Sequence, residues 1–317
     1  MTSEVVVDVL EQILVRLDVK DLIRFKSVCK SWHSLISSDR FINYHLNCSY
    51  NNDLNNYAIG HRRIVIPSSH TPMMIGSSNG LVCISKQSDG QLLVANPLTR
   101  VVKKLQQLPK LFFKMSECWG FGYDSSVNDY KVILGFPIVK TTTCFFMLSL
   151  KTNIWQLIRD VNYEPISMSM RGVFLDGSVY WLMINRINSK KVILSFELSR
   201  EEFVQISIPN ECDQDPDVRL GVIKQCLCIY RPLAYNRKPE MKWVLEKCNA
   251  KTLWKRVPND YGIKCDIIHK LKLEDRTSTQ DDNNKISIHS GLQYLCISGY
   301  YVGDPIFVQS LVSPHVR

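Results

Sequence analysis

The feature that most constrains this fold is a strand–turn–strand pattern that recurs at nearly even intervals after residue 60. Four stretches share it, namely 92–105 (LLVANPLTRVVKKL), 145–158 (FFMLSLKTNIWQLI), 192–206 (VILSFELSREEFVQI) and 242–257 (KWVLEKCNAKTLWKRV). When the polar turns are aligned on Thr99, Thr152, Arg200 and Lys251, the successive steps are 53, 48 and 51 residues. Such regularity predicts one structural unit used several times.

Each step has room for about four short strands, which is the signature of a kelch-like β-propeller blade. A β-sandwich, the other all-β arrangement, would not require such even spacing. The length after residue 60 accommodates five blades or slightly more, and the segments 64–66 and 306–312 are candidates for closing the ring. Residues 274–285 (EDRTSTQDDNNK) have the composition of an exposed polar loop.

A bulky apolar residue stands three positions after each aligned turn, at Val102, Trp155, Phe203 and Trp254. If the steps are blades, these side chains occupy equivalent core sites, and we expect the three aromatic ones to be nearly inaccessible. One or two tryptophans could instead reach the rim and line a sugar-binding face.

The first 48 residues have helical periodicity instead. The apolar residues of the first segment recur at three- and four-residue spacing, at Val9, Leu10, Ile13, Leu14 and Leu17. Asp18 is well suited to cap a second helix. The apolar residues that follow are Leu22, Phe25 and Val28 in the second helix, Trp32, Leu35 and Ile36 in a third that begins near Lys30, and Phe41, Ile42 and Leu46 in a further turn or two.

A module of about 40 residues rarely buries enough apolar surface to be stable alone. These helices must therefore bury part of their apolar surface elsewhere. Packing against the rest of the chain and docking onto the helices of a partner both satisfy this requirement.

The module contains RLDVKDLIRF at 16–25, VCKSW at 28–32 and LIS at 35–37. These residues resemble the F-box of plant F-box proteins. The sequence departs from the family at Val5 and Val6, where Leu-Pro is usual, and at Asp18, where Pro is usual. An aspartate N-cap still starts a helix there, whereas the missing Leu-Pro removes an apolar anchor and a rigid start.

The resemblance implies binding to a Skp-family adaptor and, through it, to a cullin of a ubiquitin ligase. The residues expected to bind the adaptor are Val5, Val6, Leu10, Ile13, Leu14, Leu17, Leu22, Phe25, Val28 and Trp32.

The β region is similar to the plant F-box-associated domain, and the whole chain looks closest to S-locus F-box-like proteins. The motifs that carry this similarity are SNGLVC at 78–83, Asn96-Pro97, GFGYD at 120–124, DYKV at 129–132 and SLVSP at 310–314. The fold class is therefore expected to be α+β, with a three-helix F-box at 1–48, a linker at 49–60 and a mainly antiparallel, kelch-like propeller at 61–317.

The resemblance implies a non-catalytic substrate receptor that binds an unidentified protein target, with no cofactor, metal or catalytic residue. The residues that would bind the target are not identified by sequence. Three alternatives stay open, namely an enzyme on a propeller scaffold, a glycan-binding module without a ligase role, and a nucleic-acid binder driven by the net charge of +9. The motif Gly76-x-Ser78-x-Gly80 resembles a nucleophile elbow, but the apolar run after it predicts a strand, so a turn that leads into a blade is favoured.

Net charge and cysteine content indicate which partners and which cellular compartment to expect. The net charge of +9 lies beyond residue 50 as scattered single residues, which favours acidic partners without requiring nucleic acid. The eleven cysteines form no CxxC motif and fit reduced thiols. The acidic N-terminal segment is unlike a signal peptide, and no apolar run reaches membrane-spanning length. We therefore expect a cytoplasmic or nuclear protein that binds neither membrane nor nucleic acid.

Overall fold

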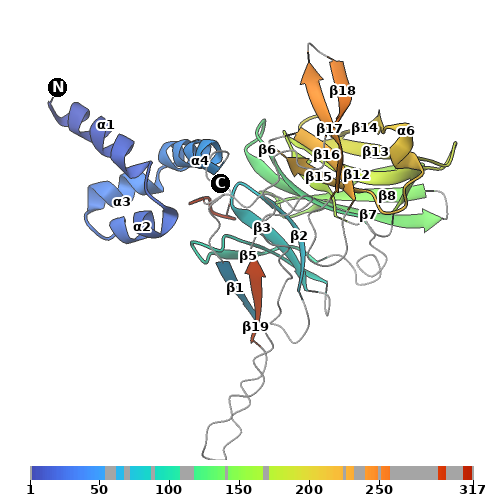
Figure 1. Ribbon diagram of the computed structural model, residues 1–317. Coiled ribbons are helices and arrows are strands. Elements are labelled where there is room, and N and C mark those ends of the chain that lie inside the picture. Colours follow the sequence, from blue (N-terminus) through green and yellow to red (C-terminus); the bar gives the residue numbers. More distant parts are fainter. Residues whose placement is uncertain are drawn as a thin grey trace, which may run out of the picture.

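The computed structural model shows four helices followed by antiparallel sheets (Figure 1). It describes residues 2–53, 62–67, 72–86, 90–107, 118–139, 142–166, 171–223, 226–231, 240–248, 251–257, 292–297 and 310–315 of the 317. Among these residues, no helix has both the length and the apolar character needed to cross a membrane.

The helical module consists of α1 (Thr2–Leu14), α2 (Val19–Phe25), α3 (Lys30–Ser37) and α4 (Asp39–Asp53). The predicted N-cap is confirmed, because the backbone N–H of Asp21 donates to Oδ1 of Asp18 at 2.9 Å. Helix α4 has 15 residues and is longer than the predicted turn or two. Residues 49–53 of the predicted linker are therefore helical, and 54–60 lie outside the described residues.

Four sheets follow and form four blades, numbered here in chain order. Blade 1 contains β2 (Pro72–Ser78), β3 (Leu81–Lys86), β4 (Gln91–Ala95) and β5 (Val102–Lys104); blade 2 contains β6 (Cys118–Asp124), β7 (Asp129–Val139), β8 (Thr142–Ser149) and β9 (Trp155–Val161). Blade 3 contains β10 (Tyr163–Pro165), β11 (Val173–Leu175), β12 (Ser178–Asn185), β13 (Lys190–Glu197) and β14 (Glu202–Ser207), and the short helix α6 (Asn210–Asp213) leads on from it. Blade 4 contains β15 (Arg219–Ile223), β16 (Cys226–Arg231), β17 (Glu240–Cys248) and β18 (Lys251–Arg256).

The repeat that the sequence predicts is confirmed by the turns between the last two strands of blades 1 to 3. The residue after each aligned position has a left-handed backbone, with φ of 61° at Arg100, 55° at Asn153 and 57° at Glu201. Each of these residues also donates its backbone N–H to the carbonyl oxygen four positions earlier, at 2.8–2.9 Å. The regular step therefore reflects one hairpin geometry used three times.

Most of the core lies between neighbouring blades, and two smaller apolar clusters lie within blade 1 and within blade 4. One apolar cluster joins blades 1 and 2, a second joins blades 2 and 3, and a third joins blades 3 and 4. The largest fully buried side chains of these clusters are Trp181, Phe121, Phe145 and Phe196. All four come from the inner three strands of their blades, where both faces of the sheet are covered.

The prediction that the repeated bulky residue is a nearly inaccessible core site is wrong. Val102 is 46% exposed, and Trp155, Phe203 and Trp254 are half-buried. All four lie on the outermost strand of a blade, which has a neighbouring strand on one side only. Each aromatic ring still packs against a cluster between two blades.

Two of these tryptophans also link blades through hydrogen bonds. The indole N–H of Trp155 donates to the carbonyl of Gln106 at 2.9 Å, and that of Trp254 donates to the carbonyl of Ser207 at 2.8 Å. Each acceptor follows or ends the outermost strand of the preceding blade, so the repeated tryptophan joins one blade to the previous one.

The pairing near the two ends of the β region differs from the expectation. Strand β1 (Arg62–Pro67) pairs antiparallel with β19 (Leu292–Ile297), so segments near the two ends of the β region lie side by side. The described residues of the predicted closing segment, 310–312, form no strand, and 306–309 lie outside the described residues. The predicted polar loop at 274–285 also lies outside them.

Candidate functional site

Among the side chains that the structure describes in the helical module, three large aliphatic ones are exposed to solvent. Val9 and Ile13 on α1 are 54% and 57% exposed, and Val28 after α2 is 59% exposed. Val9 and Ile13 are four residues apart and therefore lie on the same face of the helix. A module this small has few apolar side chains, so the exposure of three of them indicates a surface that binds something.

The side chains predicted to bind an adaptor fall into three groups. Ile13 and Val28 are exposed, Leu14 and Leu22 are buried in the core of the helical module, and Leu10, Leu17, Phe25 and Trp32 are half-buried around that core. Val5 and Val6 lie within α1, and their side chains are outside the described set. Adaptor contact by all of these residues stays a prediction.

Sequence reasoning placed Val9 in the apolar stripe but omitted it from the binding residues. Its spacing of four from Ile13 was the signal that could have included it. The half-buried Phe25 and Trp32 rings meet edge to face, with centroids 5.5 Å apart. They support the turn that presents Val28.

A basic hollow of about 380 Å³ lies beside Val28 and is lined by Lys26, Ser27, Cys29, Lys30 and His33. Burial of its stem lowers the pKa of Lys26. Among the described residues, neither Lys26 nor Lys30 forms an ion pair. A nearby anion stabilises the charged form of a half-buried, unpaired ammonium group. The hollow therefore suits an acidic side chain of a partner.

Two partly buried polar contacts hold α1 and the turn after it against α4. Nε2 of His45 donates to the carbonyl of Leu17 at 2.9 Å, which closes the turn after α1. Burial is the main cause that lowers the pKa of His45. Arg40 contacts the buried carboxylate of Glu11 at 2.8 Å. These contacts fix the helix that carries Val9 and Ile13.

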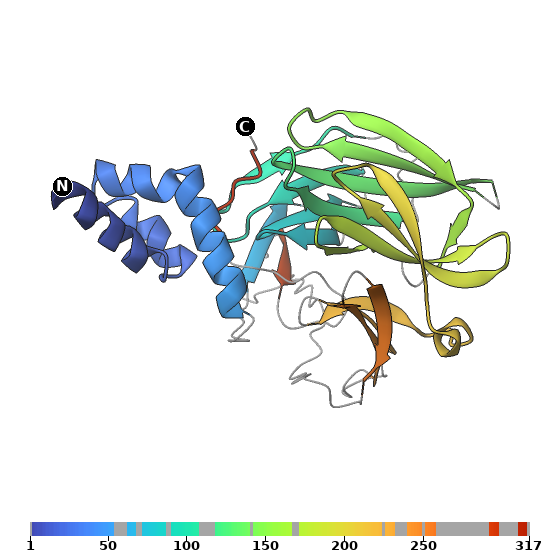
Figure 2. The same cartoon turned by 90° about the horizontal axis from the view of Figure 1, so that it is seen from above.

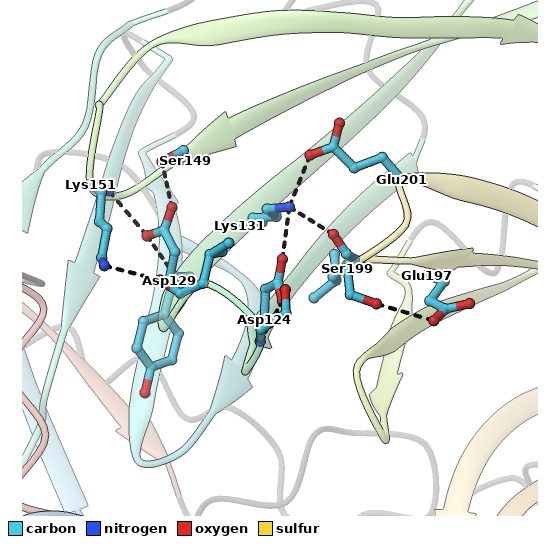
Figure 3. A network of polar contacts seen from close by, with 12 residues as sticks. Asp124, Asp129, Lys131, Ser149, Lys151, Glu197, Ser199 and Glu201 are labelled. Atoms are coloured by element: carbon cyan, nitrogen blue, oxygen red, sulfur yellow. Dashed lines mark hydrogen bonds and ion pairs between the residues drawn. The ribbon is translucent and has the colours of Figure 1, made fainter.

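A second polar cluster lies between blades 2 and 3 (Figure 3). Nζ of Lys131 contacts Oδ2 of Asp124 at 2.9 Å, Oε1 of Glu201 at 3.0 Å and the carbonyl of Leu198 at 2.7 Å. Burial alone would lower the pKa of Lys131, but the contacts with Asp124 and Glu201 outweigh it and raise the pKa. The ammonium group thus makes ion pairs with a carboxylate of each blade and a hydrogen bond to a carbonyl of blade 3, so the cluster joins the two blades.

Asp129 holds the neighbouring turn of blade 2. Its carboxylate accepts hydrogen bonds from the hydroxyl of Ser149 and from the backbone N–H groups of Tyr130 and Lys151. Figure 3 shows this group beside Lys131. The acidic residues of the DYKV and GFGYD motifs thus have structural partners.

The Ser78 turn and the Trp119–Trp181 pair, which resembled parts of a catalytic and a sugar-binding site, have structural roles. Ser78 ends β2, and Asn79 and Gly80, with φ of 51° and 78°, turn the chain into β3, which confirms the predicted turn. Trp119 and Trp181 are buried, and the indole of Trp181 donates to the carbonyl of Trp119 at 2.9 Å. The described residues hold no group of three or more His, Cys, Asp or Glu side chains suited to a metal ion.

Comparisons with known proteins give matches along nearly the whole chain. The family described as "F-box associated beta propeller domain" matches residues 34–299, and the F-box domain matches residues 5–44. An F-box protein of Arabidopsis thaliana, At1g33530, is 30% identical over 278 residues, covering 78% of this chain and 60% of that protein. The F-box/kelch-repeat protein At3g23880 of the same plant is 26% identical over 360 residues, covering 97% of this chain and 95% of that protein.

Solved structures resemble the chain only distantly. The β-propeller domain of the Trilobed protease from Pyrococcus furiosus matches with a TM-score of 0.34 and 9% identity, over 63% of this chain and 59% of that one. A likeness of this size carries no argument about function.

Proposed function

This chain belongs to the F-box-associated β-propeller family, and from that membership we propose that it is the substrate-recognition subunit of a Skp–cullin–F-box ubiquitin ligase. The observation that carries the proposal is the exposure of Val9, Ile13 and Val28 on the F-box module. These side chains form the apolar part of the adaptor-binding surface.

The adaptor surface combines apolar contact with charge. Covering a half-exposed Val or Ile contributes about 1 kcal/mol, roughly half of the value for complete burial of such a side chain. Lys26 and Lys30 would meet acidic groups of the adaptor beside this apolar contact. Leu14 and Leu22 would act indirectly, by holding α1 and α2 in place.

The β-propeller would hold a protein target near the transfer machinery of the ligase. The rate gain comes from proximity, since a target lysine that is held in place reacts as part of one complex. The propeller supplies no bond chemistry in this proposal, and its own partners are the adaptor, through it a cullin, and an unidentified target. The protein would act in the cytoplasm or the nucleus.

The test is capture of a purified Skp-family adaptor by full-length variants. We expect Ile13→Asp and Val28→Asp each to weaken capture about tenfold or more, because each places a charge in an apolar contact. Both positions are exposed in the free protein, so these variants should fold.

The matched control is Ile187→Asp, at a residue that is 84% exposed in a turn of blade 3. It makes the same chemical change far from the F-box and should leave capture unchanged. Wild-type capture by folded Ile13→Asp and Val28→Asp would disprove the proposed docking surface.

A further inference from the structure

The segment 310–315 runs between helix α4 and blade 1 (Figure 2). Two motifs that the docking surface leaves unexplained meet there, Asn96-Pro97 and SLVSP at 310–314. The side-chain amide of Asn96 donates to the carbonyls of Ser310 and Val312, both at 2.8 Å. Its oxygen accepts from the backbone N–H of Leu98 at 2.9 Å and of Thr99 at 3.3 Å. Asn96 is fully buried, so one side chain ties this segment to the turn between β4 and β5.

Successive side chains of the segment enter different hydrophobic clusters. Leu311 is buried in the core of the helical module, together with residues of α1 to α4. Val312 packs against the cluster between blades 1 and 2. Segment 310–315 therefore links the two parts of the protein, and we refer to it as the strap.

The strap supplies much of the apolar contact between the two parts. In the described residues, the core of the helical module takes in only Leu311 and Leu98 from beyond α4. Small interfaces between domains normally permit relative motion. The buried side chain of Asn96 restricts that motion, because its hydrogen bonds define one geometry. A shift of the strap breaks both hydrogen bonds from the Asn96 amide and leaves buried polar groups unpaired.

We infer that Asn96 and Leu311 are positioning residues that fix the angle between the F-box module and the propeller. This inference rests on the proposed function, because a fixed angle sets where a bound target lies relative to the transferring enzyme. The exposed residues of the proposed docking surface, Val9, Ile13 and Val28, lie outside the cluster that contains Leu311. The strap acts by narrowing the set of orientations from which ubiquitin can be transferred.

Asn96→Asp isolates the amide bonds with almost no change in shape. The acceptor oxygen toward Leu98 and Thr99 is kept, while the donor nitrogen becomes an oxygen that faces two carbonyl oxygens. Leu311→Ala removes the apolar anchor, and Leu311→Met restores its volume. Asn188→Asp is the matched control, because Asn188 is exposed and its side chain only accepts a hydrogen bond from the N–H of Lys190.

The experiment measures the distance between spin labels carried by non-canonical amino acids at Ser34 on α3 and Ile187 on blade 3, in the full chain. Both positions are exposed. We expect one narrow distribution for the wild-type chain, Leu311→Met and Asn188→Asp. Asn96→Asp and Leu311→Ala should widen it roughly twofold or more, as the domains become free to move.

A second measurement concerns transfer itself. In a reconstituted ligase without a target, ubiquitin is transferred to lysines of this chain itself. The wild-type chain should be modified at a restricted set of these lysines, and Asn96→Asp and Leu311→Ala should be modified at further ones. Adaptor capture should stay at the wild-type level in Asn96→Asp, whose side chain lies outside the core of the helical module. Unchanged distance distributions in these folded variants would overturn the inference, as would an unchanged set of modified lysines. Loss of adaptor capture by the wild-type chain would instead refute the proposed function and leave the distance result standing.

Discussion

At the scale of single residues, neighbouring side chains of the F-box module have opposite roles. Ile13 and Leu14 are adjacent in the sequence, yet one is 57% exposed and the other 1% exposed. A helix turns by about 100° per residue, so a stripe of apolar residues wider than the core presents its edge to solvent. Leu14 and Leu22 therefore maintain the fold, and substitutions at these positions would confuse loss of binding with loss of folding.

Lys26 and Lys30 make adaptor binding sensitive to salt. We expect Lys26→Glu with Lys30→Glu to weaken binding of a Skp-family adaptor about tenfold at low ionic strength, mainly through slower association. The difference should shrink at about 0.5 M salt, where charges act over only a few ångströms. Association kinetics at several salt concentrations provide the measurement.

The control for this charge reversal is Lys190→Glu, an exposed lysine in a turn of blade 3. It changes the net charge in the same direction but lies outside the hollow. If the loss in association rate per reversed charge is the same for Lys190→Glu as for Lys26→Glu with Lys30→Glu, the hollow has no special role in adaptor binding.

His45 gives the helical module a pH dependence. Its pKa is lowered in the fold, mainly by burial, so the unfolded chain binds a proton more readily than the folded one. The contribution of His45 to the free energy of unfolding is complete above the pKa of an unfolded histidine, about 6.5. It decreases as the pH falls through that value, and it stops decreasing below the lower pKa of the folded state. Hydrogen exchange of α1 and α4 in the full chain, corrected for intrinsic rates, should therefore accelerate between about pH 7 and about pH 5.

Two variants decide whether His45 is responsible. His45→Gln should remove most of the acid-induced acceleration, because the new side chain does not titrate in this range. His33→Gln should not, since His33 is exposed. If acid opens α1 and α4 equally in the wild-type chain and His45→Gln, another group causes the effect.

At the scale of elements, the inner strands of a blade and its outermost strand contribute differently to stability. Trp181→Ala empties a fully buried site on β12 and should cost about 3–5 kcal/mol. Trp155→Phe on β9 keeps most of the packing and removes the hydrogen bond to Gln106, so about 1 kcal/mol should be lost. Val102→Ala, at an exposed site, should be nearly neutral.

Soluble yield and protease resistance are suitable measurements for this series, because a multi-blade domain can unfold irreversibly. The expected order of damage is Trp181→Ala, then Trp155→Phe, then Val102→Ala. Equal damage by Trp155→Phe and Trp181→Ala would contradict the distinction between inner and outermost strands.

At the scale of the whole molecule, the blades are joined by polar contacts as well as by apolar clusters. Lys131→Met should cost about 3–5 kcal/mol, because it leaves the buried carboxylate of Asp124 without its cation. Adding Asp124→Asn should recover part of this loss. Lys151→Met is the control, since Lys151 is exposed and its Nζ contacts only the carbonyl of Val127.

The temperature at which the full-length variants unfold measures this effect. The single Lys131→Met variant should unfold at a markedly lower temperature than the Lys151→Met variant. If the two variants behave alike, the cluster between blades 2 and 3 does not hold them together.

The repeated hairpins and the helical module follow from the amino-acid sequence alone. Both depend on neighbouring residues, since a left-handed residue after each aligned turn, a capping aspartate and helical spacing act over a few positions. The tertiary structure decided which apolar residues stay exposed, that β1 pairs with β19, and that Asn96 binds carbonyls 214 and 216 positions away. Contacts between such distant residues leave no local pattern, because they depend on how the blades are arranged and where the F-box module packs.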